Sequence, residues 1–241
     1  MLKTLILAGG KGTRIKEYTE NIPKPLIEAN GSPLFIHIIR NYEKYGVDFF
    51  VLLGGYKQEK LIKYLESNSK KISKNENLFQ LETLSKVLVL DTGQESMTGG
   101  RIKVALDYFE DREFFLTYGD GISDININNL FAFFKRTNKL ATVTAVQPQA
   151  RFGSLKLSEN DVIEFNEKVN NKDTWINGGF FAIKREIKEI IKNDMTLFEK
   201  EPLEYLAKTS NLSAYKHTGF WQPVDTIRDL EVLEEFLKND K

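Results

Sequence analysis

The sequence predicts an α/β fold with a Rossmann-like, mostly parallel sheet flanked by helices and a smaller mixed β region in the second half. Short apolar runs of strand length alternate with segments whose apolar residues recur at steps of three and four, the period of a helix. The runs show no polar alternation, which favours parallel strands covered on both faces. The chain has 241 residues, of which 41% are hydrophobic and 28% are charged. This length and composition fit one domain, residues 1–241, with a sizeable core.

Each element of the first half follows from this alternation. The apolar runs predict strands at residues 2–8, 49–53, 87–90, 114–117 and 141–146. The helical periodicity between them predicts helices at residues 34–45, 58–65, 101–109 and 127–134. Ligands of such sheets bind at the carboxyl ends of the strands. The polar residues that follow each strand are therefore the candidates for a site.

The second half has a more mixed pattern. Short apolar segments between polar turns predict strands at residues 155–157, 162–165 and 178–183. Helices are predicted at residues 185–192, 201–209 and 226–237. Residues 67–77 are polar and rich in lysine, which predicts a mobile surface loop.

Charge and composition exclude several classes of protein. Thirty-four basic residues balance 34 acidic ones, so no overall field favours nucleic acid or a membrane. There is no cysteine, and His37 and His217 are the only histidines, so any metal would be held by carboxylate oxygens. The apolar run at residues 5–8 is too short for a signal peptide, and no stretch approaches the roughly 20 apolar residues of a membrane span. We expect a cytoplasmic protein.

The first predicted strand ends in a glycine-rich turn that carries two cations. The segment reads Leu5-Ile6-Leu7-Ala8-Gly9-Gly10-Lys11-Gly12-Thr13-Arg14, and Pro23-Lys24-Pro25 follows. Glycines let backbone N–H groups approach an anion, because no Cβ blocks them, while Lys11, Arg14 and Lys24 supply positive charge. The combination favours a polyphosphate ligand, although the glycines by themselves are more typical of an ordinary tight turn. The spacing matches neither the dinucleotide fingerprint nor the Walker loop.

Two aspartates from distant segments are candidate metal ligands. Asp120 lies between two glycines directly after the strand predicted at residues 114–117, and Asp225 precedes the last predicted helix. Two carboxylates suit Mg²⁺, which completes its shell with water and substrate phosphates. The alternatives are a turn aspartate for Asp120 and a helix N-cap for Asp225. Asp124 could support the metal or cap the helix that follows it.

Three further clusters could contact substrates. Lys168, in Glu167-Lys168, could hold a phosphorylated ligand, and Asn177-Gly178-Gly179 offers hydrogen bonds to a hydroxyl. The turn Ser96-Met97-Thr98-Gly99-Gly100-Arg101 offers backbone groups suited to the edge of a base. Each cluster has a plainer alternative: an exposed lysine, an ordinary turn and a strand-to-helix turn.

In this order along the chain, the clusters resemble those of the sugar-1-phosphate nucleotidyltransferases. The segments that carry the resemblance are Leu7-Ala8-Gly9-Gly10-Lys11-Gly12-Thr13-Arg14, Pro23-Lys24-Pro25-Leu26 and Tyr118-Gly119-Asp120-Gly121. Further segments are similar to the glucose-1-phosphate cytidylyltransferase family: Asp91-Thr92-Gly93, Ser96-Met97-Thr98-Gly99-Gly100-Arg101, Arg151-Phe152-Gly153, Ile176-Asn177-Gly178-Gly179-Phe180-Phe181, Glu201-Pro202-Leu203 and Gly219-Phe220-Trp221-Gln222-Pro223 with Asp225-Thr226. The resemblance runs nearly end to end. It implies a nucleotidyltransferase fold with a nucleotide-binding half, residues 1–147, and a half, residues 148–241, that binds the sugar phosphate and completes the metal site.

The resemblance also implies a role for each candidate residue. Lys24 and Arg14 would act in catalysis on the phosphates of CTP, with Lys24 at the α-phosphate, and Asp120 and Asp225 would bind Mg²⁺. The implied nucleotide contacts are Leu7, Ala8, Gly9, Gly10, Gly12, Thr13, Tyr118 and Gly119, with Met97, Thr98 and Gly99 at the cytosine. The implied contacts to the sugar phosphate are Glu167, Lys168, Asn177, Gly178 and Trp221.

The implied reaction is a direct displacement in which a sugar 1-phosphate, with α-D-glucose 1-phosphate favoured, attacks CTP and gives CDP-glucose and pyrophosphate. An ionised phosphate is already a nucleophile, so the scarcity of histidine presents no difficulty. The alternatives are CTP transfer to another phosphorylated acceptor, a non-catalytic nucleotide-sugar binding protein, and a metal-dependent glycosyltransferase. Such a glycosyltransferase would use an Asp-x-Asp motif, whereas Asp120 is followed by Gly121-Ile122-Ser123.

Two departures from the family concern the periphery. Val169 follows Glu167-Lys168 where the family usually has proline, and residues 67–86 depart from the family pattern. Comparable segments of the family bear on subunit contacts and on the substrate entrance. A homo-oligomer is expected, and these departures bear on its form and on the choice of sugar more than on the chemistry.

Overall fold

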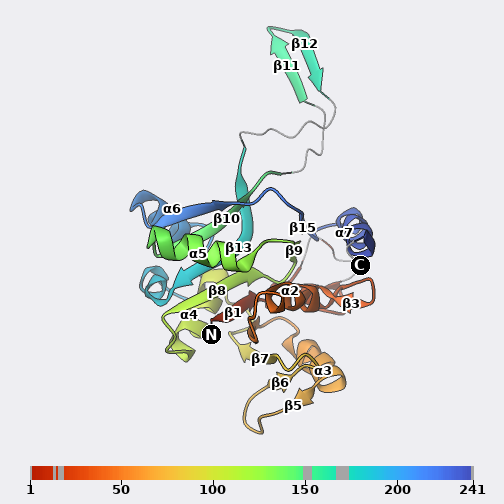
Figure 1. Ribbon diagram of the computed structural model, residues 1–241, viewed down its shortest axis with the longest axis vertical. Helices are drawn as coiled ribbons and strands as arrows, with labels where there is room; N and C mark the ends of the chain where they lie inside the picture. The colour runs from red at the N-terminus through yellow and green to blue at the C-terminus, as the bar shows by residue number, and fades with distance from the viewer. Residues whose placement is uncertain (1, 13–14, 16–18, 149–153, 167–173, 240–241) are drawn as a thin grey trace.

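The centre of the protein is a single large mixed sheet (Figure 1). The structure is a computed structural model and describes residues 2–12, 15, 19–148, 154–166 and 174–239. Within these residues the sheet has nine strands in the order β14-β10-β13-β8-β1-β4-β7-β6-β5. In chain order the strands are β1 (Lys3–Leu7), β4 (Phe49–Gly54), β5 (Lys70–Lys71), β6 (Leu78–Gln80), β7 (Lys86–Asp91), β8 (Glu113–Tyr118), β10 (Ala141–Val146), β13 (Ile176–Lys184) and β14 (Leu212–Lys216).

The middle of the sheet is parallel. β1 pairs in parallel with both β4 and β8, and β4 pairs in parallel with β7. β13 enters between β8 and β10 and runs antiparallel to both, while β14 pairs in parallel with β10. The predicted α/β class, with a mostly parallel sheet, is confirmed.

Helices cover both faces of the sheet. They are η2 (Lys24–Leu26), α2 (Leu34–Glu43), α3 (Gln58–Asn68), α4 (Thr98–Tyr108), α5 (Ile127–Thr137), η3 (Arg185–Ile190), α6 (Glu201–Lys208) and α7 (Ile227–Asn239). One core cluster joins α2, α3, α5 and α7 to one face, and the other joins α4, η3 and α6 to the opposite face. Successive residues of β1 alternate between the clusters, with Ile6 in one and Leu5 and Leu7 in the other. Because both faces are buried, the central strands read as continuous apolar runs.

Among the described residues, three small strand pairings lie outside the main sheet. They are β2 (Glu28–Ala29) with β3 (Ser32–Pro33), β9 (Gly121–Ser123) with β15 (Trp221–Pro223), and β11 (Ser154–Ser158) with β12 (Asp161–Asn166). The β9–β15 pair is antiparallel and brings together two segments about 100 residues apart along the chain. The β11–β12 hairpin lies apart from the main sheet (Figure 1) and contains two of the three strands predicted for the mixed region of the second half. The third, predicted at residues 178–183, is part of β13 in the main sheet.

One prediction of local structure was wrong. Residues 67–77, predicted as a loop, contain the edge strand β5, which pairs with β6 through Lys71 and Phe79. A strand of exposed lysines lacks the apolar pattern from which strands are predicted, and charged side chains are typical of sheet edges. The helix predicted at residues 185–192 is present as the 3₁₀ helix η3.

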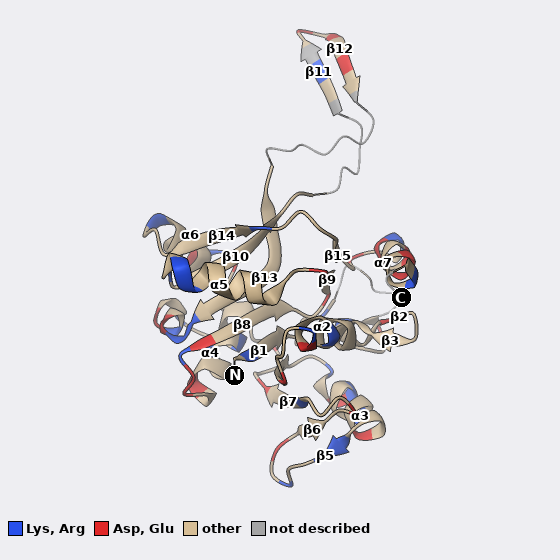
Figure 2. Ribbon diagram, viewed as in Figure 1, with Lys and Arg blue, Asp and Glu red and all other residues tan. Residues whose placement is uncertain are grey.

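Charged residues of both signs are interspersed over the helices (Figure 2), in keeping with their equal numbers. Among the helices that the structure describes, none is long and apolar enough to cross a membrane.

Candidate active site

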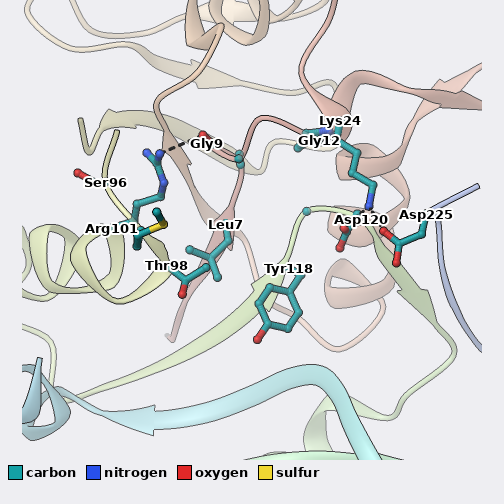
Figure 3. Close-up of a pocket in the computed structure, with 15 residues that line it drawn as sticks. Leu7, Gly9, Gly12, Lys24, Ser96, Thr98, Arg101, Tyr118, Asp120 and Asp225 are labelled. Atoms are coloured by element: carbon teal, nitrogen blue, oxygen red, sulfur yellow. Dashed lines mark hydrogen bonds and ion pairs between the residues drawn. The ribbon is translucent and has the colours of Figure 1, made fainter. Parts of the chain in front are cut away.

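A pocket of about 360 Å³ opens at the carboxyl ends of β1 and β8 (Figure 3). Its lining brings together the segments singled out in the sequence: Leu7, Ala8, Gly9, Gly10, Gly12, Lys24, Pro25, Ser96, Met97, Thr98, Arg101, Tyr118, Gly119, Asp120 and Asp225. The position agrees with the rule that ligands of open α/β sheets bind beyond the carboxyl ends of the strands.

Close packing requires glycine at two positions of the pocket, Gly12 and Gly119. Gly12 has φ 61°, and a Cβ there would lie 2.7 Å from Cγ2 of Thr19. The Thr19 hydroxyl donates to the carbonyl oxygens of Gly12 and Ile15, which closes the loop on itself. At Gly119 a Cβ would lie 2.7 Å from the carbonyl oxygen of Leu7. The backbone that follows β8 therefore lies directly against the end of β1, and there is no room for a side chain at position 119.

Arg101 holds the glycine loop against the neighbouring strands. Its side chain is only 4% exposed. The guanidinium donates to five acceptors: the carbonyl oxygens of Gly9 at 3.0 Å, Gly54 at 2.7 Å, Gly93 at 2.7 Å and Gln94 at 3.3 Å, and Oγ1 of Thr92 at 2.8 Å. Burial lowers the pKa of Arg101, and the neighbouring carboxylates of Asp91 and Glu95 oppose that shift. The sequence analysis assigned no role to this residue, and its one signal was its place at the end of the Met-Thr-Gly-Gly-Arg segment.

Lys24, Asp120 and Asp225 converge at one end of the pocket (Figure 3). Nζ of Lys24 lies 2.5 Å from Oδ2 of Asp120 and 2.7 Å from Oδ1 of Asp225, and the three side chains are 11, 31 and 22% exposed. Burial alone would lower the pKa of Lys24, but attraction and hydrogen bonds to the two carboxylates raise it overall. Lys24 is therefore a cation in the resting site.

The β9–β15 pair positions the two aspartates. Asp120 immediately precedes β9, and the N–H of Val224, which follows β15, donates to the carbonyl oxygen of Asp120 at 2.9 Å. Asp225 is thereby placed beside Asp120 although the two residues are 105 positions apart in the sequence.

The helix-cap alternatives for Asp225 and Asp124 do not hold. At the start of α7, N–H of Asp229 donates to Oγ1 of Thr226, and Oδ2 of Asp229 accepts from N–H of Thr226 at 2.9 Å. This reciprocal capping leaves the carboxylate of Asp225 on Lys24. At α5 the cap is Asn126, and Asp124 instead lies 3.0 Å from Nε2 of His217.

The donor set at Asp120 and Asp225 fits a hard divalent cation. Both carboxylates already converge on one cationic group, the ammonium of Lys24. Across the described part of the chain, no three His, Cys, Asp or Glu side chains group as metal ligands. Two protein carboxylates leave the remaining positions of a magnesium-like shell to water and to substrate phosphates.

The turn before α4 forms the wall of the pocket that contains Met97 and Thr98, and backbone hydrogen bonds hold it to residues outside the pocket. N–H of Met97 donates to the carbonyl oxygen of Asp194 at 2.8 Å, and N–H of Gly99 donates to that of Thr196 at 2.9 Å. Gly99 is absent from the lining, and its N–H is already bonded, whereas the side chains of Met97 and Thr98 line the pocket. A base contact at Gly99 stays a prediction.

The predicted sugar contacts lie beside the pocket. Nδ2 of Asn177 donates to the hydroxyl of Tyr118 at 3.3 Å, and Nε1 of Trp221 donates to the carbonyl oxygen of Gly178 at 2.7 Å. The structure thus groups Asn177, Gly178 and Trp221 next to the wall that Tyr118 forms. Four predicted residues lie outside the described residues: Thr13, Arg14, Glu167 and Lys168.

The fold and this pocket define a nucleotide-transfer enzyme, and comparison with known proteins agrees. The nucleotidyl transferase family profile matches residues 3–240, and the chain belongs to that family. It is 40% identical over 250 residues to glucose-1-phosphate cytidylyltransferase of Salmonella typhi, covering 100% of this chain and 97% of the relative. It is 41% identical over 239 residues to the probable glucose-1-phosphate cytidylyltransferase of Bacillus subtilis, covering 95% and 93% of the two chains.

A solved structure extends the comparison. HddC of Yersinia pseudotuberculosis, crystallised with GMP-PN, superposes with a TM-score of 0.74 and 25% identity over 98% of this chain and 100% of that chain. The glucose-1-phosphate cytidylyltransferase family predicted from the sequence is thereby confirmed, and the protein is an enzyme. Sugar-1-phosphate nucleotidyltransferases generally use a divalent metal, in keeping with the paired carboxylates.

Proposed function

We propose that this enzyme transfers the cytidylyl group of CTP to α-D-glucose 1-phosphate and releases pyrophosphate. The relatives that it matches over nearly the whole chain carry this activity in their names. The observation that carries the proposal is the convergence of Lys24, Asp120 and Asp225 beside a glycine loop that can hold phosphates. A protein that only binds a nucleotide sugar needs no such cluster of charge.

The chemistry is a single displacement at phosphorus. An oxygen of the sugar phosphate attacks the α-phosphorus of CTP and forms a new P–O bond, while the bond to the bridging oxygen breaks and its electron pair leaves with pyrophosphate. The attacking oxygen is ionised, so no side chain has to remove a proton. Catalysis then consists of positioning and charge neutralisation.

Each part of the pocket has a role in this step. Backbone N–H groups of the loop from Gly9 to Gly12 hold the triphosphate, and Lys24 neutralises charge at the α-phosphate. Asp120 and Asp225 hold Mg²⁺, which, when bound, neutralises further phosphate charge. Lys24 is already oriented toward these carboxylates in the resting site.

Base and sugar recognition belong to the two walls. Met97 and Thr98 line the pocket where the cytosine would lie, and Asn177 lies beside Tyr118 on the side assigned to the glucose hydroxyls. On the strength of the family resemblance, Arg14 and Thr13 would bind CTP phosphates, and Glu167 and Lys168 would bind the sugar phosphate. The homo-oligomer and the cytoplasmic location stay predictions.

A substrate panel tests the proposal. Pyrophosphate release is measured with CTP, UTP, dTTP, ATP and GTP, each against a set of sugar 1-phosphates and against other phosphorylated acceptors. We expect CTP with glucose 1-phosphate to have the highest kcat/KM. Equal rates with UTP or dTTP would remove the assignment of cytosine to Met97 and Thr98. A better non-sugar acceptor would favour the alternative cytidylyltransferase, and tight binding without turnover would favour the non-catalytic protein.

A further inference from the structure

The carboxylate of Glu199, which lies outside the pocket lining, is hydrogen-bonded to two residues of the lining. Oε1 of Glu199 accepts from the hydroxyl of Tyr118 at 2.7 Å, and Oε2 of Glu199 accepts from Oγ1 of Thr98 at 2.6 Å. Thr98 and Tyr118 both line the pocket, but Glu199 is not part of the lining. Its two oxygens therefore contact two separate parts of the pocket at the same time. One is Thr98 on the nucleotide wall, and the other is Tyr118, a predicted nucleotide contact that is hydrogen-bonded to Asn177 on the sugar wall.

The backbone that carries Glu199 is held firmly against the start of α4. N–H of Phe198 donates to Oγ1 of Thr98 at 2.9 Å, so that this hydroxyl both accepts and donates in a fixed orientation. The ring of Phe198 is fully buried and packs on Phe181 at a centroid distance of 5.7 Å. At Gly100 a Cβ would lie 2.5 Å from the carbonyl oxygen of Asp194, so the paired glycines of α4 allow this close approach.

Tyr118 links Glu199 by hydrogen bonds to Asn177 on the sugar wall. Its hydroxyl donates to Glu199 and accepts from Nδ2 of Asn177 at 3.3 Å, while Oδ1 of Asn177 accepts from N–H of Gly179 at 2.8 Å. The ring is confined, because a Cβ at Gly179 would lie only 2.4 Å from it.

We propose that Glu199 is a positioning residue that couples the nucleotide wall of the pocket to its sugar wall. The connection runs from Thr98 through Glu199 and Tyr118 to Asn177. A nucleotide that contacts Thr98 strengthens its hydrogen bond to Glu199, and Glu199 then holds Tyr118 and Asn177 in the arrangement that meets the sugar. Such coupling is reciprocal: each ligand raises the affinity of the site for the other by the same factor. This inference rests on the proposed function, because it assigns the two walls to CTP and to the sugar phosphate.

The test measures this coupling factor at equilibrium. The affinity for a CTP analogue with a methylene group between the α- and β-phosphates is measured by calorimetry with and without saturating glucose 1-phosphate. The ratio of the two Kd values is the coupling factor, and no turnover occurs. We expect a factor of about 5 to 150 in the wild-type enzyme. We expect Glu199→Ala to bring it close to 1 while the Kd of each ligand alone changes by less than about threefold.

Two matched variants make the result specific. Glu199→Gln still spans both hydroxyls and should retain part of the coupling. Glu201→Ala removes an exposed carboxylate two positions away, which pairs with Lys192 at 2.8 Å, and should leave the coupling unchanged. If Glu199→Ala does not fold, Thr98→Val and Tyr118→Phe each remove one arm of the connection and should abolish the coupling singly.

The outcomes separate this inference from the proposed function. No coupling in the wild-type enzyme, or unchanged coupling in Glu199→Ala, overturns the role of Glu199 even when the enzyme makes CDP-glucose. Equal weakening of both separate affinities with an intact ratio would show a merely structural residue and would also overturn it. Absence of CDP-glucose formation by the wild-type enzyme counts against the proposed function instead.

Discussion

Replacing Arg101 with methionine should destabilise the enzyme strongly, although the residue has no role in the proposed chemistry. The substitution keeps much of the apolar stem and removes a guanidinium that donates to five acceptors. Four of these acceptors are backbone carbonyls. Through them Arg101 connects the glycine loop after β1 to the last residue of β4 and to the residues that follow β7. Within the described part of the chain, the carbonyl oxygen of Gly9 without Arg101 keeps only the N–H of Tyr56, and that of Gly54 keeps only the N–H and hydroxyl of Thr92. The carbonyl oxygens of Gly93 and Gln94 lose the guanidinium as a partner.

The magnitude follows from the burial and the number of bonds. A hydrogen bond to a charged group contributes about 1.5–3 kcal/mol, but bonds that share one group are not additive. Leaving a buried acceptor without its partner costs about 1–3 kcal/mol, and Arg101→Met removes a partner from five acceptors at once, so we expect it to lower the free energy of unfolding by about 3–5 kcal/mol. At about 2–4 °C per kcal/mol for a chain of this size, Tm should fall by about 6–20 °C.

Urea unfolding followed by circular dichroism, without nucleotide, measures this loss. Arg136→Met is the control, because Arg136 is exposed on α5, where it lies over the ring of Phe133, and the expected change is within about 0.5 kcal/mol. Gly55→Ala tests the same network, since its Cβ would lie only 2.1 Å from Nη1 of Arg101. A loss below about 1 kcal/mol in Arg101→Met would refute the reasoning that this side chain fixes the loop.

Three further predictions concern the catalytic groups and their support. Asp225→Asn should reduce pyrophosphate release by at least about 100-fold with an unchanged circular dichroism spectrum, and near-normal turnover would reduce the residue to a structural role. Gly119→Ala should cost about 1–3 kcal/mol in urea unfolding, because its Cβ would lie 2.7 Å from the carbonyl oxygen of Leu7. Gly121→Ala, where a Cβ meets nothing within 4 Å, should be nearly neutral, and equal effects at both glycines would contradict the packing argument. The pKa of Lys24 is raised in the folded state, so its stabilising contribution is fully present below the unfolded lysine pKa of about 10.4 and is lost as the pH rises through the higher folded value. The difference in unfolding free energy between wild type and Lys24→Met should therefore be constant from about pH 7 to 10 and shrink above that, and a difference that grows with pH would contradict the assignment.

Much of the fold could be predicted because the central strands are buried on both faces. β1, β4, β7, β8 and β10 all read as apolar runs, and the predicted strand at residues 141–146 has the bounds of β10. The edge strand β5 has no such signal, since both of its residues are exposed lysines. The helix predicted at residues 101–109 begins three residues after the observed start of α4 at Thr98, because the paired glycines there do not indicate a helix.

The candidate site was predictable at charged residues whose side chains suit phosphate or metal binding. Lys24 and Asp120 were singled out by charge next to proline or glycine, Asp225 was singled out by its position before the last predicted helix, and the family resemblance set their order. Their meeting point depends on the β9–β15 pair, and none of the short apolar segments predicted either strand. Asp225 was open to two roles until the capping of α7 by Thr226 and Asp229 was visible.

Glu199 could not have been found from the sequence. It lies in a charged segment that reads as the start of an exposed helix, and its partner Thr98 is 101 positions away. Contacts of that separation follow from the packing of η3 and the loop after it against α4, which no local pattern encodes. The glycines at positions 99 and 100, read as donors to a base, turn out to allow that packing.

The central claim is that the pocket at Lys24 joins CTP to glucose 1-phosphate by attack at the α-phosphorus. Two samples of CTP, labelled with ³²P at the α- or the γ-phosphate, are incubated with the enzyme, Mg²⁺ and glucose 1-phosphate, and the products are separated. We predict that the α-label appears in CDP-glucose and the γ-label in pyrophosphate, in equal amounts. Transfer of the γ-label to the sugar, or its release as orthophosphate, would contradict the account.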